Sequence, residues 1–273
     1  MQVWEYRELL GNLVRKELKV KYKNSILGFV WSLLNPALYL VVFYVVFQLI
    51  LGSAIEKFPI FLLCGLIPWN FFSAAVSAGC TGISGNASLV VKVWFPREIL
   101  PLSAVGAAFV HYVLQSAVLI AALLMFRWMP AWEYVPLLIP ALIAMAIFVV
   151  AMAIFLSAVN VYLRDTQHLL ELALLAWFWL TPIVYAYQLV ANKMGSYAAL
   201  YLLNPMTSVV ITYQRALYNR TETSAKPPTP ILPNEPPLWY LRNLMLVIVA
   251  SSVLLWVALW MFGRLEDNFA EEI

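Results

Sequence analysis

Long apolar runs without charged residues dominate the pattern of hydrophobic and polar positions along the chain. A transmembrane helix needs roughly 20 apolar residues. Seven runs without Asp, Glu, Lys or Arg reach that length, at residues 24–55, 58–91, 99–126, 134–163, 172–192, 194–214 and 243–263. The sixth run has Asn204-Pro205 at its centre, and a proline there leaves backbone groups that protein or water must satisfy. We therefore predict an all-α membrane protein with six transmembrane helices and short re-entrant or gate helices between spans 5 and 6.

A second helical pattern precedes the first run. Apolar residues recur at spacings of three and four between Tyr6 and Tyr22, and charged residues fill the positions between them. This pattern predicts an amphipathic helix on the inner leaflet, within residues 1–25. Its basic positions are Arg7, Arg15, Lys16, Lys19, Lys21 and Lys23. A plain basic tail that only fixes the orientation of the chain is the alternative.

The distribution of basic residues predicts the topology. With six spans, ten of the 17 Lys and Arg residues lie on the side of the N-terminal segment, so both termini are expected in the cytoplasm. The expected units are an interface helix at 1–25, a transmembrane domain at 26–263 with an outer loop at about 190–238, and a cytoplasmic tail at 264–273. A seventh span would place the tail outside. Residues 226–237 contain six prolines and are predicted to be extended and solvated.

Composition supports a membrane protein and removes several classes of function. Of the 273 residues, 63% are hydrophobic and 11% charged, and the mean hydropathy is +0.83. The net charge of +3 comes from residues that set topology, so no nucleic-acid partner is expected. Cys64 and Cys80 lack the spacing of a metal or redox motif, and we expect both to pack in the interior.

The sequence lacks the motifs of common catalytic sites. It contains no GxxxxGK[ST], HExxH or GxSxG motif, so we expect no catalytic residues and no metal or cofactor in this chain. Within the apolar runs His111 is the one ionisable residue at depth, and we expect a neutral, hydrogen-bonded imidazole there rather than a proton relay. A transporter of this kind is either a passive pore or takes energy from a partner.

Aromatic residues with polar tips are concentrated in the first and fifth runs. Interfacial belts and helix packing are one explanation. A channel lining that offers flat faces and hydroxyl groups to sugar rings is the other. The residues are Tyr39, Phe43, Tyr44, Phe47, Trp177, Phe178, Trp179, Tyr185 and Tyr187.

Four motifs, in order along the chain, resemble one transporter family. They are KVKYKNSILGFVWSLLNP at 19–36, FPREILPLS at 95–103, VYLRD at 161–165 and LNPM at 203–206. Together they resemble the ABC-2 type permeases that export polysaccharides and polyol phosphates, the Wzm- and TagG-like membrane subunits of O-antigen and teichoic acid exporters. The proline-rich stretch is not part of that pattern.

The resemblance implies a homodimer of six-span subunits in a bacterial inner or plasma membrane. Two copies of a P-loop ABC ATPase would bind this pair and would hold the ATP and Mg that the permease itself does not bind. The N-terminal helix and the first inner loop would dock on the ATPase. The residues that match the coupling positions are Lys92, Trp94, Phe95, Arg97 and Glu98, with Arg164 and Asp165 in the second inner loop.

The resemblance also assigns the translocation path. Spans 1 and 5 would line the channel, and the segment at Asn204 and Pro205 would form an outer gate. The lining residues would be Tyr39, Phe43, Tyr44, Phe47, Trp177, Trp179 and Tyr185. The basic N-terminal residues would either hold the diphosphate of a lipid-linked substrate or bind anionic lipid.

We therefore expect the permease subunit of an ATP-driven exporter for a lipid-linked polysaccharide or a teichoic acid-like polymer. An ABC-2 permease for a small lipophilic drug keeps the fold and changes the cargo. A membrane glycosyltransferase or acyltransferase would need convergent acidic or His residues at one membrane face. An ion-coupled carrier is opposed by the absence of Asp, Glu, Lys and Arg from the spans.

Overall fold

The computed structural model is helical and describes residues 6–21, 30–50, 52–93 and 95–272. The helices are α2 (Arg7–Lys21), α3 (Val30–Phe43), α4 (Phe58–Cys80), α5 (Ala87–Lys92), α6 (Ile99–Met125), α7 (Leu138–Tyr162), α8 (Thr166–Trp179), α9 (Tyr187–Met194), α10 (Ala198–Tyr201), α11 (Pro205–Tyr213), α12 (Pro237–Leu265) and α13 (Phe269–Glu272). Single turns of other helix types join several of them, at Tyr44–Ile50, Ser84–Asn86, Val135–Leu137, Gly195–Tyr197, Gln214–Tyr218 and Glu266–Asn268. The predicted all-α class is confirmed for these residues.

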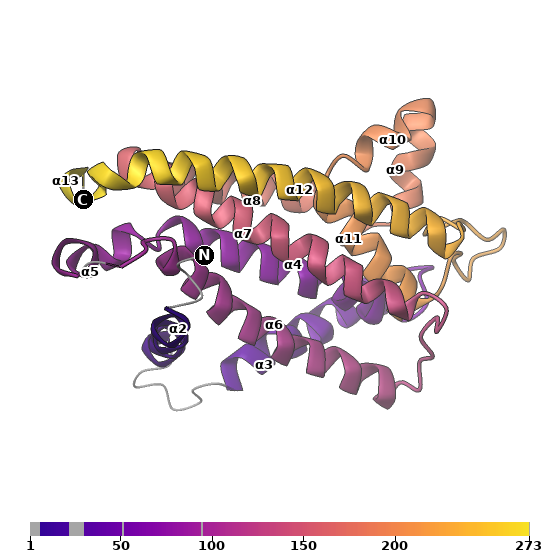
Figure 1. Ribbon diagram of the computed structural model, residues 1–273. Helices are drawn as coiled ribbons and strands as arrows, with labels where there is room; N and C mark the ends of the chain where they lie inside the picture. Colours follow the sequence, from indigo (N-terminus) through magenta and orange to yellow (C-terminus); the bar gives the residue numbers. More distant parts are fainter. Residues whose placement is uncertain (1–5, 22–29, 51, 94, 273) are drawn as a thin grey trace.

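The long helices α4, α6, α7 and α12 form the body of the molecule (Figure 1). Helix α12 lies along α7, and α4 packs against both α6 and α7. Helices α2, α5 and α13 lie at one end of this body, which we call the α5 end. Helices α9 and α10 project from the opposite end, which we call the α9 end. Segments from both ends of the sequence thus meet at the α5 end.

Small residues allow the central helices to approach closely. A Cβ atom added to Gly79 of α4 would lie 2.6 Å from the Cβ of Ala153 on α7. Lipid tails are as apolar as the side chains, so the hydrophobic effect does not drive helices together within a membrane. Membrane helices therefore rely on close packing of this kind. Helix α4 is the most enclosed of the long helices, and both cysteines lie buried and free, Cys64 on α4 and Cys80 at its end. Their predicted interior packing is confirmed.

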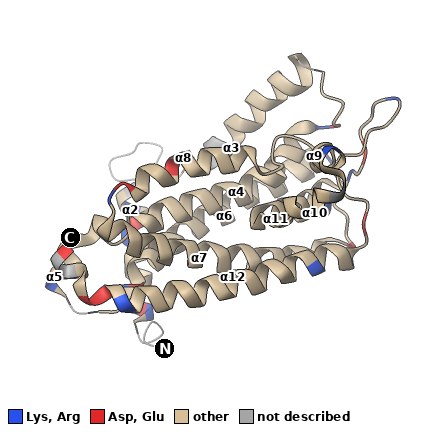
Figure 2. Cartoon of the chain, turned by 90° about the horizontal axis from the view of Figure 1, so that it is seen from above, with Lys and Arg blue, Asp and Glu red and all other residues tan. Residues whose placement is uncertain are grey.

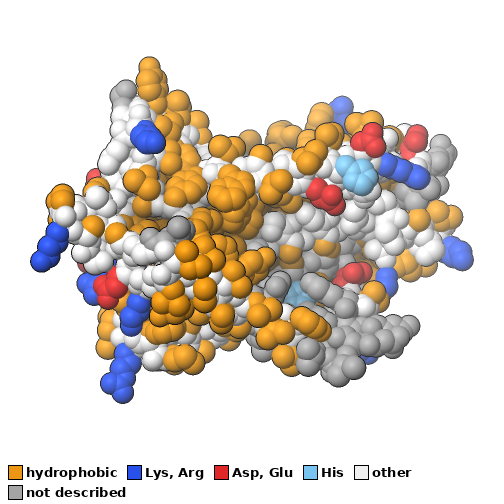
Figure 3. Space-filling model, turned by 180° about the vertical axis from the view of Figure 1, so that it is seen from behind, with side chains coloured by type: hydrophobic (Ala, Val, Ile, Leu, Met, Phe, Trp, Pro, Cys, Tyr) orange, Lys and Arg blue, Asp and Glu red, His pale blue; other side chains and the backbone are white. Residues whose placement is uncertain are grey.

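Most of the charged residues lie near the two ends of the body, and few lie in its middle (Figure 2). On the face seen in Figure 3, apolar side chains form a broad surface between the charged ends. A charged group in hydrocarbon is expensive to desolvate. This distribution therefore suits a protein whose middle lies within a bilayer.

The predicted spans are reproduced only in part. Four described helices are long and apolar enough to cross a membrane, at Phe58–Cys80, Ile99–Met125, Val135–Tyr162 and Pro237–Asn268. The first predicted run begins in residues that the structure does not describe, and Ala37–Ile50 is a shorter apolar helix. Helix α3 continues directly into the helical segment Tyr44–Ile50, and the two together correspond to roughly 30 Å of helix, close to the thickness of the hydrocarbon.

The fifth predicted run, residues 172–192, is wrong as a single helix. Helix α8 has 14 residues and ends at Trp179, a turn follows through Thr181-Pro182, and α9 begins at Tyr187. Proline disfavours helical geometry in the residue before it. Apolar composition alone therefore extended this prediction past a turn that the sequence also encodes.

One expectation for the α9 end is confirmed and another is corrected. The sixth run is broken as predicted, and α11 lies in the protein core, with every residue from Met206 to Tyr213 buried. In the proline-rich stretch 226–237, residues 226–230 are exposed. Pro230 forms an isolated antiparallel β-bridge with Glu222. Ile231 and Leu232 are buried, so this stretch is not solvated throughout.

Candidate coupling face and α9-end junction

Helix α2 is held against the bundle by its apolar face. Leu13 is buried in a cluster with residues of α6, α7 and α12. The Val14 side chain lies over Gly106 of α6, where an added Cβ would come within 2.8 Å of it. The predicted helix is therefore present, with its apolar face packed on protein and its basic face exposed. Its place on the inner leaflet stays a prediction.

The basic face of α2 carries the residues that the sequence singled out. Arg7, Arg15, Lys16 and Lys19 are exposed. The Lys21 side chain and the whole of Lys23 lie outside the described residues. The Lys16 ammonium donates to the Asn86 side-chain oxygen at 2.7 Å, which links α2 to the turn before α5.

The first inner loop follows α5 and contains both exposed and buried members of the predicted coupling set. Lys92 is exposed, whereas Phe95 is 8% exposed and packs with the cluster beneath α2. Trp94 lies outside the described residues. The Phe95 ring therefore anchors the loop, and Lys92, with the half-buried Glu98, is what the loop presents to its surroundings.

The C-terminal tail holds this loop, which the sequence analysis did not anticipate. The Arg97 guanidinium donates to the Glu266 carbonyl and lies 5.9 Å from the centre of the Phe269 ring. Phe269 is fully buried and packs edge-on against Phe262 at 5.3 Å. The Tyr162 hydroxyl donates to the Leu265 carbonyl at 3.0 Å. The one aromatic residue of the tail at 264–273, Phe269, was the available signal.

The tail also reaches the second inner loop. Arg164 and Asp165 are exposed, just before α8 begins. Arg164 and Glu272 line one hollow of about 270 Å³. Glu98, Glu266 and Lys92 line a neighbouring hollow of about 600 Å³. The predicted coupling residues of both loops are thus gathered at the α5 end, with α13 between them.

At the α9 end, Asn204 joins the end of α8 to the start of α11. Its side-chain oxygen accepts from the Trp177 indole at 2.9 Å and from the Met206 backbone N–H at 3.1 Å. Its amide nitrogen donates to the Thr181 hydroxyl at 3.0 Å. Asparagine is a favoured helix N-cap and proline a favoured first residue, so Asn204-Pro205 starts α11.

A pair of tyrosines extends this junction. The Tyr185 hydroxyl donates to the Trp179 carbonyl at 2.7 Å and lies 2.9 Å from the Tyr201 hydroxyl. Burial raises the pKa of Tyr201 above its ordinary value. The phenol stays neutral at physiological pH and remains a hydrogen-bond donor.

The predicted lining residues fall into three environments: the exposed surface, a half-buried stack and the α9-end junction. Tyr39, Tyr44 and Trp179 are exposed on the surface of the chain, at 40%, 41% and 59%. Phe43 and Phe47 are half-buried and stack at 5.6 Å, and Phe47 stacks on Phe58 at 4.4 Å.

Trp177 belongs with the junction rather than with the exposed set. Besides its bond to Asn204, its ring packs edge-on against Phe72 at 5.1 Å and Phe148 at 5.9 Å.

The sequence analysis also overlooked Arg215, whose guanidinium lies 4.1 Å from the centre of the Tyr134 ring and donates to Asn219.

These features define a polytopic helical membrane protein with polar assemblies at both ends and a middle with few charges. The family model of the ABC-2 type transporter matches residues 8–218, and the chain belongs to this family. It is 33% identical over 272 residues to the O-antigen export system permease protein RfbA of Myxococcus xanthus, covering 100% of this chain and 98% of that protein.

Two other relatives are more distant. An O-antigen export system permease protein RfbA of Klebsiella pneumoniae is 27% identical over 264 residues, which are 97% of this chain and 94% of that protein. The polysialic acid transport protein KpsM of Escherichia coli is 27% identical over 124 residues, or 45% of this chain and 46% of that protein.

Proposed function

We propose that this chain is the permease subunit of an ATP-driven exporter that moves a lipid-linked polysaccharide across a bacterial inner membrane. The observation that carries the proposal is similarity over the whole chain to a permease whose name assigns it to O-antigen export. The middle of the body, with its few charges, supports a path for a neutral glycan (Figure 2). A teichoic acid-like polymer is the nearest alternative cargo.

The permease does not hydrolyse ATP in this proposal. Two P-loop ATPase subunits bind at the α5 end, where α2, Lys92, Glu98, Arg164 and Asp165 are presented. Closure of the ATPase pair on ATP pushes this face, and the nucleotide favours one of two states of the permease. Because α13 lies between the two inner loops, both loops move together with the tail.

Six crossings per subunit, with both termini in the cytoplasm, complete the proposal. The four long apolar helices supply four crossings. The segment from α3 through Ile50 supplies the first, and α8 with the junction supplies the fifth. A second copy of the chain would then cover the exposed aromatic surface of α3 and α8, so that Tyr39, Tyr44 and Trp179 line a shared channel.

Export in cells tests this function. Deleting the gene should leave lipid-linked glycan inside the cell, and the intact chain should restore glycan at the surface. A variant with Arg97→Glu and Glu98→Arg should still assemble with the ATPase but fail to restore surface glycan. Normal surface glycan in the deletion strain would overturn the proposed cargo.

A further inference from the structure

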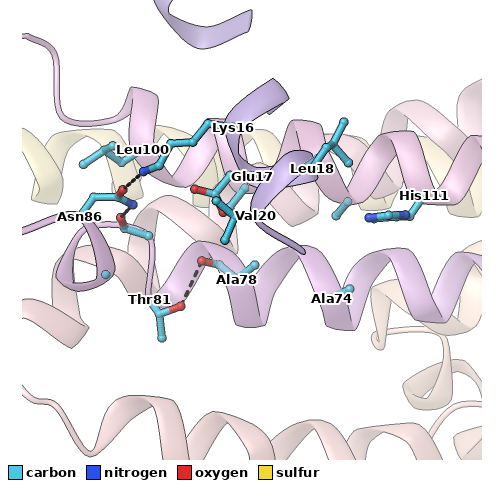
Figure 4. A pocket seen from close by; sticks show the side chains of 15 residues that line it. Lys16, Glu17, Leu18, Val20, Ala74, Ala78, Thr81, Asn86, Leu100 and His111 are labelled. Atoms are coloured by element: carbon cyan, nitrogen blue, oxygen red, sulfur yellow. Dashed lines mark hydrogen bonds between the residues drawn. The ribbon is translucent and has the colours of Figure 1, made fainter. Parts of the chain in front are cut away.

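A slot of about 400 Å³ lies between α2, α4 and α6 at the α5 end of the body (Figure 4). Its lining on α6 extends from Leu100 to His111, which at about 1.5 Å per residue corresponds to roughly 16 Å of helix. Figure 4 places Asn86 near one end of the slot and His111 near the other. The slot is therefore long and narrow rather than round.

Small apolar side chains form the walls of the slot. Ala74 and Ala78 of α4 face it from one side, and Ala104, Ala107 and Ala108 of α6 from another. Alanine walls give close contact to a thin hydrocarbon chain and offer it no hydrogen bonds. Leu18 and Val20 of α2 complete the apolar lining.

Two neighbouring residues of α2 bring opposite charges to the slot. Lys16 and Glu17 both line it, and both extend from α2 in Figure 4. The Lys16 ammonium donates to a neutral acceptor, the Asn86 amide oxygen, and the Asn86 amide nitrogen donates to the Gly82 carbonyl at 2.9 Å. The Lys16 charge therefore remains available to an anion, and the Glu17 carboxylate to a cation.

We propose that the slot binds one acyl chain of a phospholipid whose headgroup carries both a phosphate and a primary ammonium. The phosphate binds Lys16, the ammonium binds Glu17, and the chain lies along the alanines. A purely anionic lipid would satisfy Lys16 but place its charge beside the Glu17 carboxylate. Charge-assisted hydrogen bonds of this kind are short and about twice as strong as neutral ones.

The lipid would fasten α2 to the body. Its headgroup contacts α2 and its chain contacts α4 and α6, so it adds to the Leu13 and Val14 contacts that already hold this helix. The proposal depends on the chain lying in a membrane and not on the cargo that it exports.

Lipid binding to the delipidated full-length protein in detergent tests the proposal. Phosphatidylethanolamine, phosphatidylglycerol and phosphatidylcholine with identical chains are titrated and followed by native mass spectrometry. The structure predicts that the ethanolamine lipid binds tightest. The choline lipid keeps the phosphate but has no N–H to donate, so its affinity should be about tenfold lower.

Variants separate the two charges. Lys16→Ala should weaken binding of all three lipids, whereas Glu17→Gln should abolish the preference for ethanolamine and raise the affinity for glycerol. Glu8→Gln is the matched control for Glu17→Gln, because Glu8 is an exposed acidic residue of α2 outside the slot. Equal binding of ethanolamine and choline lipids, or an ethanolamine preference unchanged in Glu17→Gln, would overturn the headgroup assignment.

The chain is tested separately. Ala107→Leu fills the slot and should abolish specific binding, whereas Ala121→Leu, at an exposed alanine of the same helix, should not. Water-soluble phosphoethanolamine should not compete, and shortening the acyl chains should lower affinity in wild type. Competition by free phosphoethanolamine would overturn the chain assignment, and a polyprenyl phosphate that binds more tightly than the ethanolamine lipid would reassign the slot to the export substrate.

Discussion

At the scale of single residues, Phe269 is the contact on which the arrangement of the α5 end depends most. Its fully buried ring packs against Phe262 and lies beneath the Arg97 guanidinium. Arg97 in turn donates to the backbone of the tail at Glu266. The tail and the first inner loop therefore hold one another in place through a few side chains.

Replacing Phe269 with Ala should release the tail from this loop. Truncating a buried Phe typically costs about 3–5 kcal/mol of packing free energy. A helix of only four residues, such as α13, should not stay docked on the loop after such a loss. We expect ATP hydrolysis by the assembled complex to continue while glycan export falls at least tenfold. Phe269→Leu should keep part of the export and Asn268→Ala, at the exposed neighbouring position, should keep all of it. Wild-type export by Phe269→Ala would show that the tail does not position the loop.

Asn204 has the corresponding place at the α9 end. Asn204→Ala removes a helix cap worth about 1 kcal/mol and leaves the Trp177 indole without its acceptor, at a further cost of about 1–3 kcal/mol. The thermal unfolding temperature of the purified protein should fall. Asn192→Ala, on the exposed surface of α9, should leave it unchanged. If both variants unfolded at the wild-type temperature, the result would contradict a stabilising role of the Asn204 side chain at the junction.

At the scale of secondary-structure elements, the attachment of α2 to α6 depends on the close fit between Val14 and Gly106. Gly106→Val should displace α2 and make Arg15 and Lys16 more sensitive to trypsin. Val14→Ala should restore protection in the double variant, because residues in contact are not additive. Gly263→Val is the control, since nothing lies within 4 Å of a Cβ added there. Unchanged trypsin resistance in Gly106→Val would contradict this packing.

The elements differ in how far sequence predicts them. The α2 pattern is local and periodic, and Asn204-Pro205 is a local helix start, so both could be found without the fold. The turn at Thr181-Pro182 was also encoded locally, but the apolar composition on both sides of it was given too much weight. The burial of α11 and the contact of Phe269 with Phe262 depend on residues distant in sequence, and no local pattern specifies them.

At the scale of the whole molecule, the account requires six crossings with the α5 end in the cytoplasm. Single cysteines introduced at Trp132, in the connection between α6 and α7, and at Glu222, in the connection before α12, lie at exposed positions and should react with an impermeant maleimide in intact cells. Cysteines at Lys92, Arg164 and Glu272 should react only after permeabilisation. Cys64 and Cys80 are buried and should contribute little background. Labelling of Glu272→Cys in intact cells would favour a seventh crossing.

The sparsely charged middle and the charged α5 end give the molecule a division of roles. In the proposed function, the middle offers a path with few fixed charges and the α5 end offers surfaces on which a partner acts (Figure 2). This division explains why the chain carries no nucleotide-binding motif although it belongs to a transporter family.

Reconstitution tests the central claim most directly. The purified chain alone should show no ATP hydrolysis. Together with its P-loop ATPase in proteoliposomes, it should move a lipid-linked glycan between leaflets only when ATP is present, measured by the accessibility of the glycan to a glycosidase added outside. ATP-independent movement by the chain alone, or no movement of glycan by the complete, ATP-hydrolysing complex, would contradict the account.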